Sequence, residues 1–193
     1  SAKLMLDQVG NARETAGKTD IGAYQTKALV DVVEFYNAPL NHYFVTASAD
    51  EAKGIDSGAA GAGWSRTGKA WKSWALKEPG TAPVCRFYAF TANSHFYTGD
   101  KAECKALADA NPKGERALGW ILEGDVYSIV SPKVDMATVS CEEGYMPLYR
   151  LFNRAYEIAG KTDSNHRYTT EAAVVAEMVA KGWKDEKIVM CVK

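Results

Sequence analysis

The sequence repeats one pattern three times, and this repetition restricts the possible folds more than any other feature. Each copy contains a short run of β-branched and aromatic residues, a turn-forming segment, a second aromatic run, an acidic, Ala-rich segment and a Gly-Trp pair. The copies occupy about residues 31–75, 83–130 and 146–193. A unit of this size cannot bury both faces of its own sheet, so the copies are expected to pack around one common core.

Two kinds of residue recur at fixed places in the pattern. The aromatic run after the turn contains all three histidines of the protein, His42, His95 and His166. A glycine precedes three of the five tryptophans, Trp64, Trp120 and Trp183. We align the histidines at one position and the tryptophans at another. This shared placement predicts that all six residues stabilise the repeat itself, with each histidine bound to local backbone and each tryptophan in the core.

The local sequence of one unit predicts strand, hairpin, helix and strand. The β-branched and aromatic runs favour two strands, and the Asn-, Pro- and Gly-containing stretch between them favours a turn. Ser48 and Thr170 are the expected N-caps of the helices in the first and third units, with Glu51 completing a capping box in the first. Gly182 is placed to end the third helix, and Trp183 to begin the last strand.

The predicted fold is therefore a β-rich α+β domain. It consists of three ββαβ-like repeats in a pseudo-threefold arrangement, with small helices outside the strands. Residues 1–30 fall outside the repeat and are interpreted as a linker or the tail of an upstream region. A short helix is expected over residues 4–12 within that segment.

The four cysteines are Cys85, Cys104, Cys141 and Cys191. They form no Cys-x-x-Cys pair, which argues against a Cys-based zinc site. Of the three possible pairings we favour Cys85–Cys104 and Cys141–Cys191, because each bridge then stays within one repeat. Disulfides imply an oxidising compartment, so we expect a secreted, extracellular or cell-surface protein. Four buried thiols in a cytosolic protein are the alternative.

Charge and hydropathy restrict the partners. The net charge is −1, and this balance offers no basic field for nucleic acid. No apolar run reaches membrane-spanning length. The chain begins at Ser1 without a leader, as expected of a processed or truncated piece.

The repeated strings as a set resemble a known family. The residues that carry the resemblance are 33–37 with 41–44, 83–88 with 93–98, 163–170 and 189–191. They are similar to a C-terminal repeat domain of unknown function, found as an accessory module beside hydrolases and surface proteins in large secreted bacterial proteins. The resemblance covers about residues 31–193. It implies secretion and a non-catalytic, adhesive or polymer-binding role, but no ligand, cofactor or catalytic residue.

Exposed aromatic residues are the candidates for binding a carbohydrate or cell-surface polymer, which is the favoured function. Trp71 and Trp74 have no counterparts in the other units and lie beside lysine. Tyr36, Tyr88 and Tyr149 fall near one another in the repeat and have both an apolar ring and a polar hydroxyl. Packing in the core is the alternative role for all five residues.

Two other functions remain open. The first is a protein-binding adhesion or structural module, in which the polar insertion at residues 154–164 contacts the partner. The second is a metal-dependent hydrolase, in which the three histidines converge on the axis and bind zinc. No acidic residue lies at a fixed offset from the histidines to support a metal.

No catalytic sequence motif is present, so an enzyme is not expected. Arg86 and Arg150 share one position in the repeat, at which the first unit has Glu34. Exposed salt bridges are the simplest role for these three residues.

Overall fold

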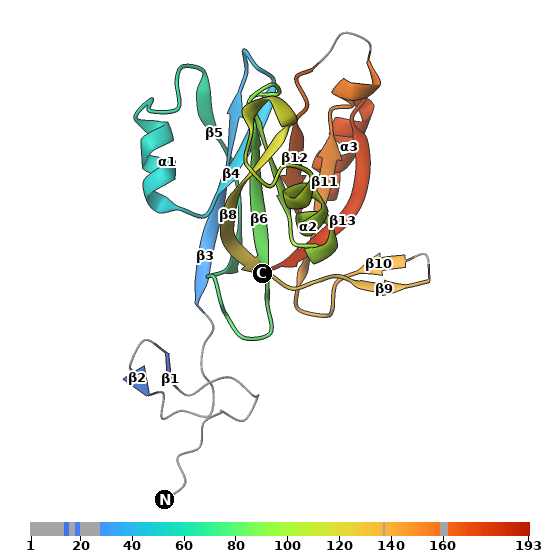
Figure 1. Ribbon diagram of the computed structural model, residues 1–193. Coiled ribbons are helices and arrows are strands. Elements are labelled where there is room, and N and C mark those ends of the chain that lie inside the picture. The colour runs from blue at the N-terminus through green and yellow to red at the C-terminus, as the bar shows by residue number, and fades with distance from the viewer. Residues whose placement is uncertain (1–13, 16–17, 20–27, 137, 159–161) are drawn as a thin grey trace, which may run out of the picture.

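The computed structural model of the protein describes residues 14–15, 18–19, 28–136, 138–158 and 162–193 (Figure 1). The helix expected over residues 4–12 lies outside these residues. Two short strands, β1 (Glu14–Thr15) and β2 (Lys18–Thr19), pair with each other ahead of the repeats.

The three units have the same succession of elements. The first contains β3 (Leu29–Asn37), β4 (His42–Thr46), α1 (Ala49–Asp56) and β5 (Trp64–Trp74). The second contains β6 (Ala82–Ala89), β7 (Ser94–Thr98), α2 (Lys101–Ala110), the 3-10 helix η1 (Arg116–Leu118) and β8 (Trp120–Ile129). The third contains β11 (Met146–Phe152), η2 (Ala155–Glu157), β12 (His166–Thr169), α3 (Ala172–Ala180) and β13 (Lys184–Val192). The expected β-rich α+β class is confirmed.

In every unit the first strand is central and pairs antiparallel with the other two. The hydrogen-bonded sheets nevertheless divide the units unevenly, because β5 pairs with β8 and joins the first two units into one six-stranded sheet, β4-β3-β5-β8-β6-β7. The third unit forms its own three-stranded sheet, β12-β11-β13. Backbone hydrogen bonds from Val130 to Cys191 and from Lys72 to Lys193 tie the end of β13 to the other two units.

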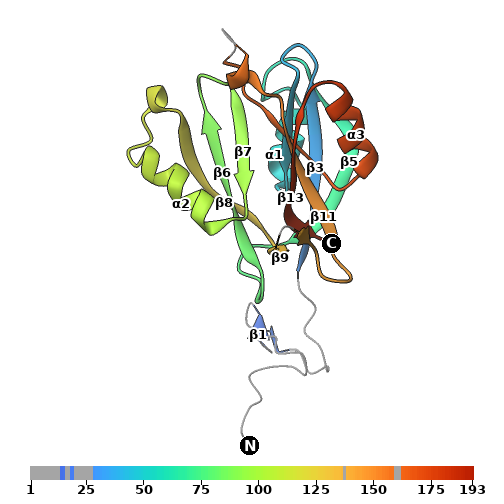
Figure 2. The ribbon, with the colours of Figure 1, turned by 90° about the vertical axis from the view of Figure 1, so that its right-hand side faces the viewer.

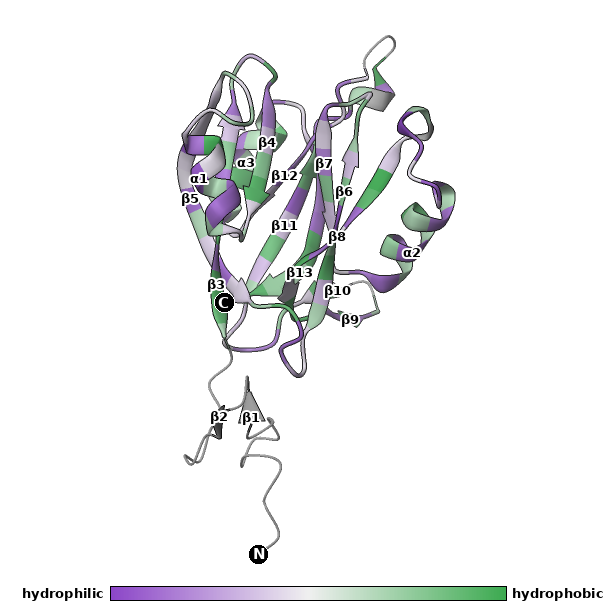
Figure 3. Cartoon of the chain, turned by 60° about the vertical axis from the view of Figure 1, so that its left-hand side comes forward, coloured by the Kyte–Doolittle hydropathy of each residue, from purple (hydrophilic) through white to green (hydrophobic). Residues whose placement is uncertain are grey.

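The helices lie outside the strands, as Figures 1 and 2 show. The connector between the second and third units forms a hairpin of β9 (Lys133–Asp135) and β10 (Thr138–Ser140), which projects from the domain (Figure 1). The hydropathy colours alternate along strands such as β11 (Figure 3), as expected for strands with one buried and one wetter face.

The core contains the second strand of each hairpin. The Tyr97 hydroxyl donates to the carbonyl of Val45 (2.6 Å), and the Tyr168 hydroxyl donates to the carbonyl of Tyr97 (2.7 Å). Both tyrosines are buried, and these bonds satisfy hydroxyls that water cannot reach. They also link the three hairpins to one another. Trp71 and Trp74 are buried as well, with 5% and 3% of their surfaces exposed.

Helix capping follows the sequence in part. Ser48 caps α1 and accepts a hydrogen bond from the amide of Glu51, as predicted. The predicted capping box is wrong, since the Ser48 amide donates to Thr46 and the Glu51 carboxylate binds Arg86. The prediction of Thr170 as a cap is wrong, since Glu171 is the N-cap of α3 and its side chain makes no capping bond. Gly182 adopts φ of 90° just after α3, which confirms the predicted left-handed ending.

The two disulfides pair as predicted. Cys85–Cys104 joins β6 to α2 within the second unit, whereas Cys141–Cys191 joins the connector before the third unit to β13, so the second bridge does not stay within one repeat as expected. The first bridge closes a separation of 19 residues and the second one of 50. Both restrict the unfolded chain and so stabilise the fold, each by roughly 2–4 kcal/mol.

Candidate functional site

The strand register places the histidines at two different positions of the repeat. The cross-strand pairs in the three hairpins include Tyr36–Tyr43, Tyr88–His95 and Phe152–His166. Tyr43, His95 and His166 are therefore equivalent, and the preceding position holds His42, Ser94 and Asn165. The prediction that all three histidines share one position is wrong. Since neighbouring strand residues point to opposite faces, a slip of one residue moves a side chain across the sheet.

His42, Ser94 and Asn165 hold the three hairpins together. His42 is buried, with Nδ1 3.0 Å from the carbonyl oxygen of Asn93 and Nε2 3.3 Å from that of Asp163. The Asn165 amide donates to Ser94 Oγ at 2.9 Å. His42 does bind backbone, but the backbone of the other two units rather than its own hairpin. This position therefore joins the units.

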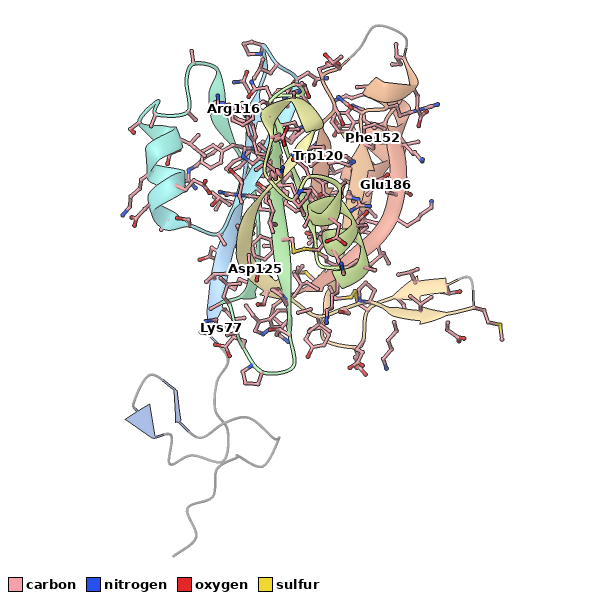
Figure 4. All side chains as sticks on the ribbon, viewed as in Figure 1. Lys77, Arg116, Trp120, Asp125, Phe152 and Glu186 are labelled. Atoms are coloured by element: carbon pink, nitrogen blue, oxygen red, sulfur yellow. A yellow bond between two sulfur atoms is a disulfide. The ribbon has the colours of Figure 1, made fainter. Side chains whose placement is uncertain are left out.

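Two pockets lie at successive boundaries between units. Pocket A, of about 540 Å³, lies between the first and second units, and pocket B, of about 270 Å³, between the second and third. Seven residues lining pocket A are Phe44, Glu51, Ile55, Trp64, Tyr88, His95 and Glu123. The residues at the same repeat positions line pocket B, namely Phe96, Glu103, Leu107, Trp120, Phe152, His166 and Glu186. Trp120, Phe152 and Glu186, labelled in Figure 4, come from β8, β11 and β13.

One arginine fixes two carboxylates in pocket A. Arg86 Nη1 lies 3.0 and 2.8 Å from the two carboxylate oxygens of Glu51, and Nε donates to Glu123 at 2.7 Å. His95 Nε2 lies 3.4 Å from the same Glu123 oxygen. Burial, with the nearby Arg86 charge, lowers the pKa of His95 to about 3, so the imidazole is neutral at physiological pH.

Pocket B has the same ionic arrangement. Arg150 Nε donates to Glu186 at 2.7 Å, and Nη1 and Nη2 donate to Glu103 at 2.9 and 3.1 Å. His166 Nε2 lies 3.6 Å from Glu186, and burial with the Arg150 charge lowers the pKa of His166 to about 3. The Arg150 side chain is only 11% exposed. The expectation of exposed salt bridges is therefore wrong for the arginines, because each is held between two glutamates under a pocket.

Aromatic rings form the apolar wall of each pocket. In pocket A the His95 ring lies 4.8 Å from the rings of both Phe44 and Tyr88, and Trp64 meets Phe44 edge-on. In pocket B His166 lies 4.9 Å from the rings of Phe96 and Phe152, and Trp120 meets Phe96 at 5.7 Å. Trp64 and Trp120 are half-buried, so part of each indole remains accessible beside the carboxylates.

The third boundary, between the third and first units, is filled by an ion pair. Arg167 stands where the other boundaries have Phe44 and Phe96, and it binds both carboxylate oxygens of Glu34 at 2.9 Å. The two side chains are 8% and 1% exposed. The guanidinium also lies over the Tyr43 ring. The expected exposed role of Glu34 is thus wrong, since its carboxylate is buried and paired.

The predicted binding residues are scattered. Tyr88 lines pocket A. Trp71 and Trp74 lie in the core, and the Tyr36 hydroxyl binds Asn41 while its ring packs on Tyr43. Tyr149 is half-buried in β11 and lines neither pocket.

The glutamates of the pockets were missed by the sequence reasoning, although a signal exists. Each of Glu51 and Glu103 follows the equivalent phenylalanine, Phe44 or Phe96, by seven residues, and each of Glu123 and Glu186 follows the repeated tryptophan by three. The offsets are constant from these aromatic residues and vary from the histidines. Aligning on the histidines therefore concealed them.

The histidines do not converge. His42 is bound inside the core, and His95 and His166 line separate pockets. Within the described residues, no three His, Cys, Asp or Glu side chains are grouped to hold a metal ion. The described part of the chain contains no helix long and apolar enough to cross a membrane.

A comparison with protein families agrees with the repetition. The family described as "Domain of unknown function (DUF5648)" matches residues 11–122 and again residues 63–193. The two matches start 52 residues apart (63 minus 11), the same separation as Phe35 and Phe87, which are equivalent in the first two units. No curated protein and no solved structure matches the chain. Since the family covers more than half of the chain in each match, the chain belongs to this family of domains of unknown function.

Proposed function

We propose that the protein is a non-catalytic extracellular module that binds a carbohydrate or cell-surface polymer, with pocket A as the site for one sugar residue. One observation carries the proposal: pocket A places accessible aromatic surface beside two glutamates that an arginine holds in place. A sugar ring has an apolar face and a rim of hydroxyl donors, and this pocket complements both.

The aromatic wall supplies the apolar part of the interaction. Trp64 and Tyr88 come from different units and are both half-buried. A pyranose placed against the indole removes apolar area of both partners from water, at roughly 25 cal/mol per Å². The rings are held by packing against Phe44 and His95, so little side-chain freedom is lost on binding.

The polar part comes from carboxylates with spare acceptor capacity. Glu51 and Glu123 are each 32% exposed, so both can meet a ligand while bound to Arg86. Hydrogen bonds from sugar hydroxyls to ionised carboxylates are stronger than neutral ones. Because Arg86 already orients both groups, the site is pre-organised for a polyhydroxy ligand.

The pseudo-threefold arrangement is part of this proposal. Arg86 of the second unit binds the first unit, Arg150 of the third binds the second, and Glu34 of the first binds Arg167 of the third. These bonds follow one another around a ring, which supports an arrangement in which each unit contacts both of the others. The disulfides and the resemblance to accessory modules support an extracellular location.

A glycan array and pull-downs on insoluble polysaccharides test the proposal. We expect the wild-type protein to bind, and Trp64→Ala and Glu123→Gln to weaken binding at least fivefold. Glu157→Gln is the matched control, because Glu157 pairs with Arg154 away from both pockets and its loss should leave binding unchanged. Absence of binding by the wild type in both assays contradicts the proposal.

Protein binding is a second candidate, favoured by the β9–β10 hairpin. Val134 is 74% exposed and Met136 is 99% exposed near its turn. Apolar side chains on a projecting hairpin suit a protein partner. The test immobilises the wild-type protein and a Val134→Ser/Met136→Ser variant on separate beads and compares the partner proteins that each captures. Equal capture by the wild type and the variant contradicts this role.

A further inference from the structure

We propose that pocket B is a second ligand site, selective for a pyranose that carries one carboxylate. This inference rests on the proposed carbohydrate-binding function and adds to it a second site and a different substrate class. Pocket A is expected to favour neutral sugars.

Pocket B contains buried polar atoms that have no partner in the described part of the chain. Ser164 is fully buried and His166 is 10% exposed at its side chain, and both line the pocket. Ser164 Oγ and His166 Nδ1 have no hydrogen-bond partner within the described residues. Leaving a buried polar group unpaired has a cost in free energy. Both atoms have less than 1 Å² of accessible surface, so a ligand hydroxyl reaches either one only after a small shift of the lining side chains, and the new bond then removes this cost.

Of the two pockets, only pocket B has a lysine in its lining. Lys184 lines pocket B and pairs across the strands with Phe152. At the same place beside pocket A, Tyr88 pairs with Ile121. Lys184 is exposed, and no carboxylate of the described residues forms an ion pair with it. Its charge is therefore free to bind an anionic ligand.

The charges around the two pockets differ accordingly. Pocket A has one positive charge, Arg86, against two negative charges, Glu51 and Glu123, and repels a carboxylate. Pocket B has the same set in Arg150, Glu103 and Glu186, and Lys184 balances it. His95 and His166 are neutral, so they do not change the net charge of either pocket. Only pocket B can accept a single negative charge without net repulsion.

Imidazole NMR signals provide the test, because the protein has only three histidines. His95 reports on pocket A, His166 on pocket B, and His42, bound in the core, is the internal control. The probes are methyl β-D-glucuronide and methyl β-D-glucoside. We expect the glucuronide to shift the His166 signal with higher affinity than the glucoside, and the glucoside to shift the His95 signal.

Two reciprocal variants test the role of the amine. Lys184→Ile should weaken glucuronide binding at His166 up to about fivefold, the range of exposed ion pairs. Ile121→Lys places an amine beside pocket A and should let glucuronide shift the His95 signal. Lys184 is exposed and Ile121 is half-buried, and unchanged signals of His42 in the free proteins report an intact fold.

The outcomes separate this inference from the proposed function. If the glucoside shifts His95 and the glucuronide never shifts His166, pocket B is not a second site and the proposed function stands. If both sugars shift His166 equally and Lys184→Ile has no effect, the selectivity is wrong. If neither sugar nor any array glycan binds, the proposed function itself fails.

Discussion

The boundaries that contain pockets A and B are open, and the boundary filled by Arg167 and Glu34 is closed. The open and closed boundaries use the same repeat positions in opposite ways. At the open boundaries, Arg86 and Arg150 reach from the first strand of one unit to a glutamate on the helix of the preceding unit. At the closed boundary the first strand has Glu34, and the cation, Arg167, comes from the hairpin strand of the neighbouring unit. Where the first strand has Glu34 in place of arginine, the arginine, Arg167, comes from the hairpin strand instead. Its side chain lies in the space that is a pocket at the other two boundaries.

The presence of a pocket at a boundary depends on which side chain fills one position of the repeat. Phe44 and Phe96 form one wall and leave room beside them, whereas Arg167 extends over Tyr43 to reach Glu34. At the closed boundary Trp183 is buried, with 8% of its surface exposed, whereas Trp64 and Trp120 at the open boundaries are half-buried. One boundary therefore contributes mainly stability, and two leave surface for a ligand.

The largest expected effect is from breaking the closed boundary. Glu34→Gln keeps the shape of the side chain and leaves Arg167 charged, buried and without its carboxylate. Removing one partner of a buried ion pair costs about 3–5 kcal/mol. Urea unfolding of the variant should show this loss. Glu157→Gln, at an exposed ion pair, should lower the free energy of unfolding by less than about 1 kcal/mol. Equal losses in the two variants would contradict a buried ion pair at the closed boundary.

The next effect concerns the helix beside pocket B. The Cys85–Cys104 bridge attaches α2, which supplies Glu103 and Leu107 to that pocket. Replacing both cysteines by serine should cost about 3 kcal/mol, from the 19-residue separation that the bridge closes. Hydrogen exchange should accelerate more in α2 than in α3 at the closed boundary. Equal acceleration in both helices contradicts a local role of the bridge.

Acid should act on the open boundaries first. In the folded protein the pKa of His95 and of His166 is lowered to about 3, below the ordinary value of about 6.5. As the pH falls, these histidines therefore become protonated in the unfolded chain before they do in the folded one. The free energy of unfolding is at its full value above pH 6.5 and declines as the pH falls towards 3. Between pH 7 and 5 the loss is about 2 kcal/mol for each histidine.

The closed boundary supplies the control for this prediction. It has Tyr43 at the histidine position, and a phenol does not titrate in acid. A His95→Tyr/His166→Tyr variant, which copies that position, should unfold in urea with a flatter dependence on pH between 7 and 5. The same pH dependence in wild type and variant would show that the two imidazoles are not kept neutral by the fold.

The sequence predicted the elements and the disulfides well, because these depend on local chemistry and on the repeat. Ser48 and Gly182 are recognised from residue types at short spacing, and the cysteine pairing follows from the repeat although its bridges span 19 and 50 residues. The hairpin register was harder to predict. Asn41-His42 and Ser94-His95 look alike in sequence, but the strands pair His42 with Asn37 and His95 with Tyr88, which differ by one position.

The candidate site was hidden for a related reason. Each pocket combines side chains from two units, and the glutamates that line it come from a helix and a closing strand far apart in the sequence. Their offsets become visible only when Phe44 is aligned with Phe96 and Trp120 with Trp183. The charge pattern also misled, because Arg86, Arg150 and Glu34 read as exposed surface residues until their partners in other units are known.

The smallest expected effect compares the helices at the two kinds of boundary. Ser48 caps α1 beside pocket A, whereas α3 at the closed boundary begins at Glu171 without a side-chain cap. Ser48→Ala should therefore cost about 1 kcal/mol in urea unfolding, and Thr170→Ala should cost a few tenths at most. The capped helix supplies Glu51 to the pocket, so Ser48→Ala should also weaken glycan binding at pocket A slightly, by less than Glu123→Gln does. A larger loss from Thr170→Ala than from Ser48→Ala would mean that the start of α3 depends on a bond of the Thr170 hydroxyl, and the contrast between the two helices would then be wrong.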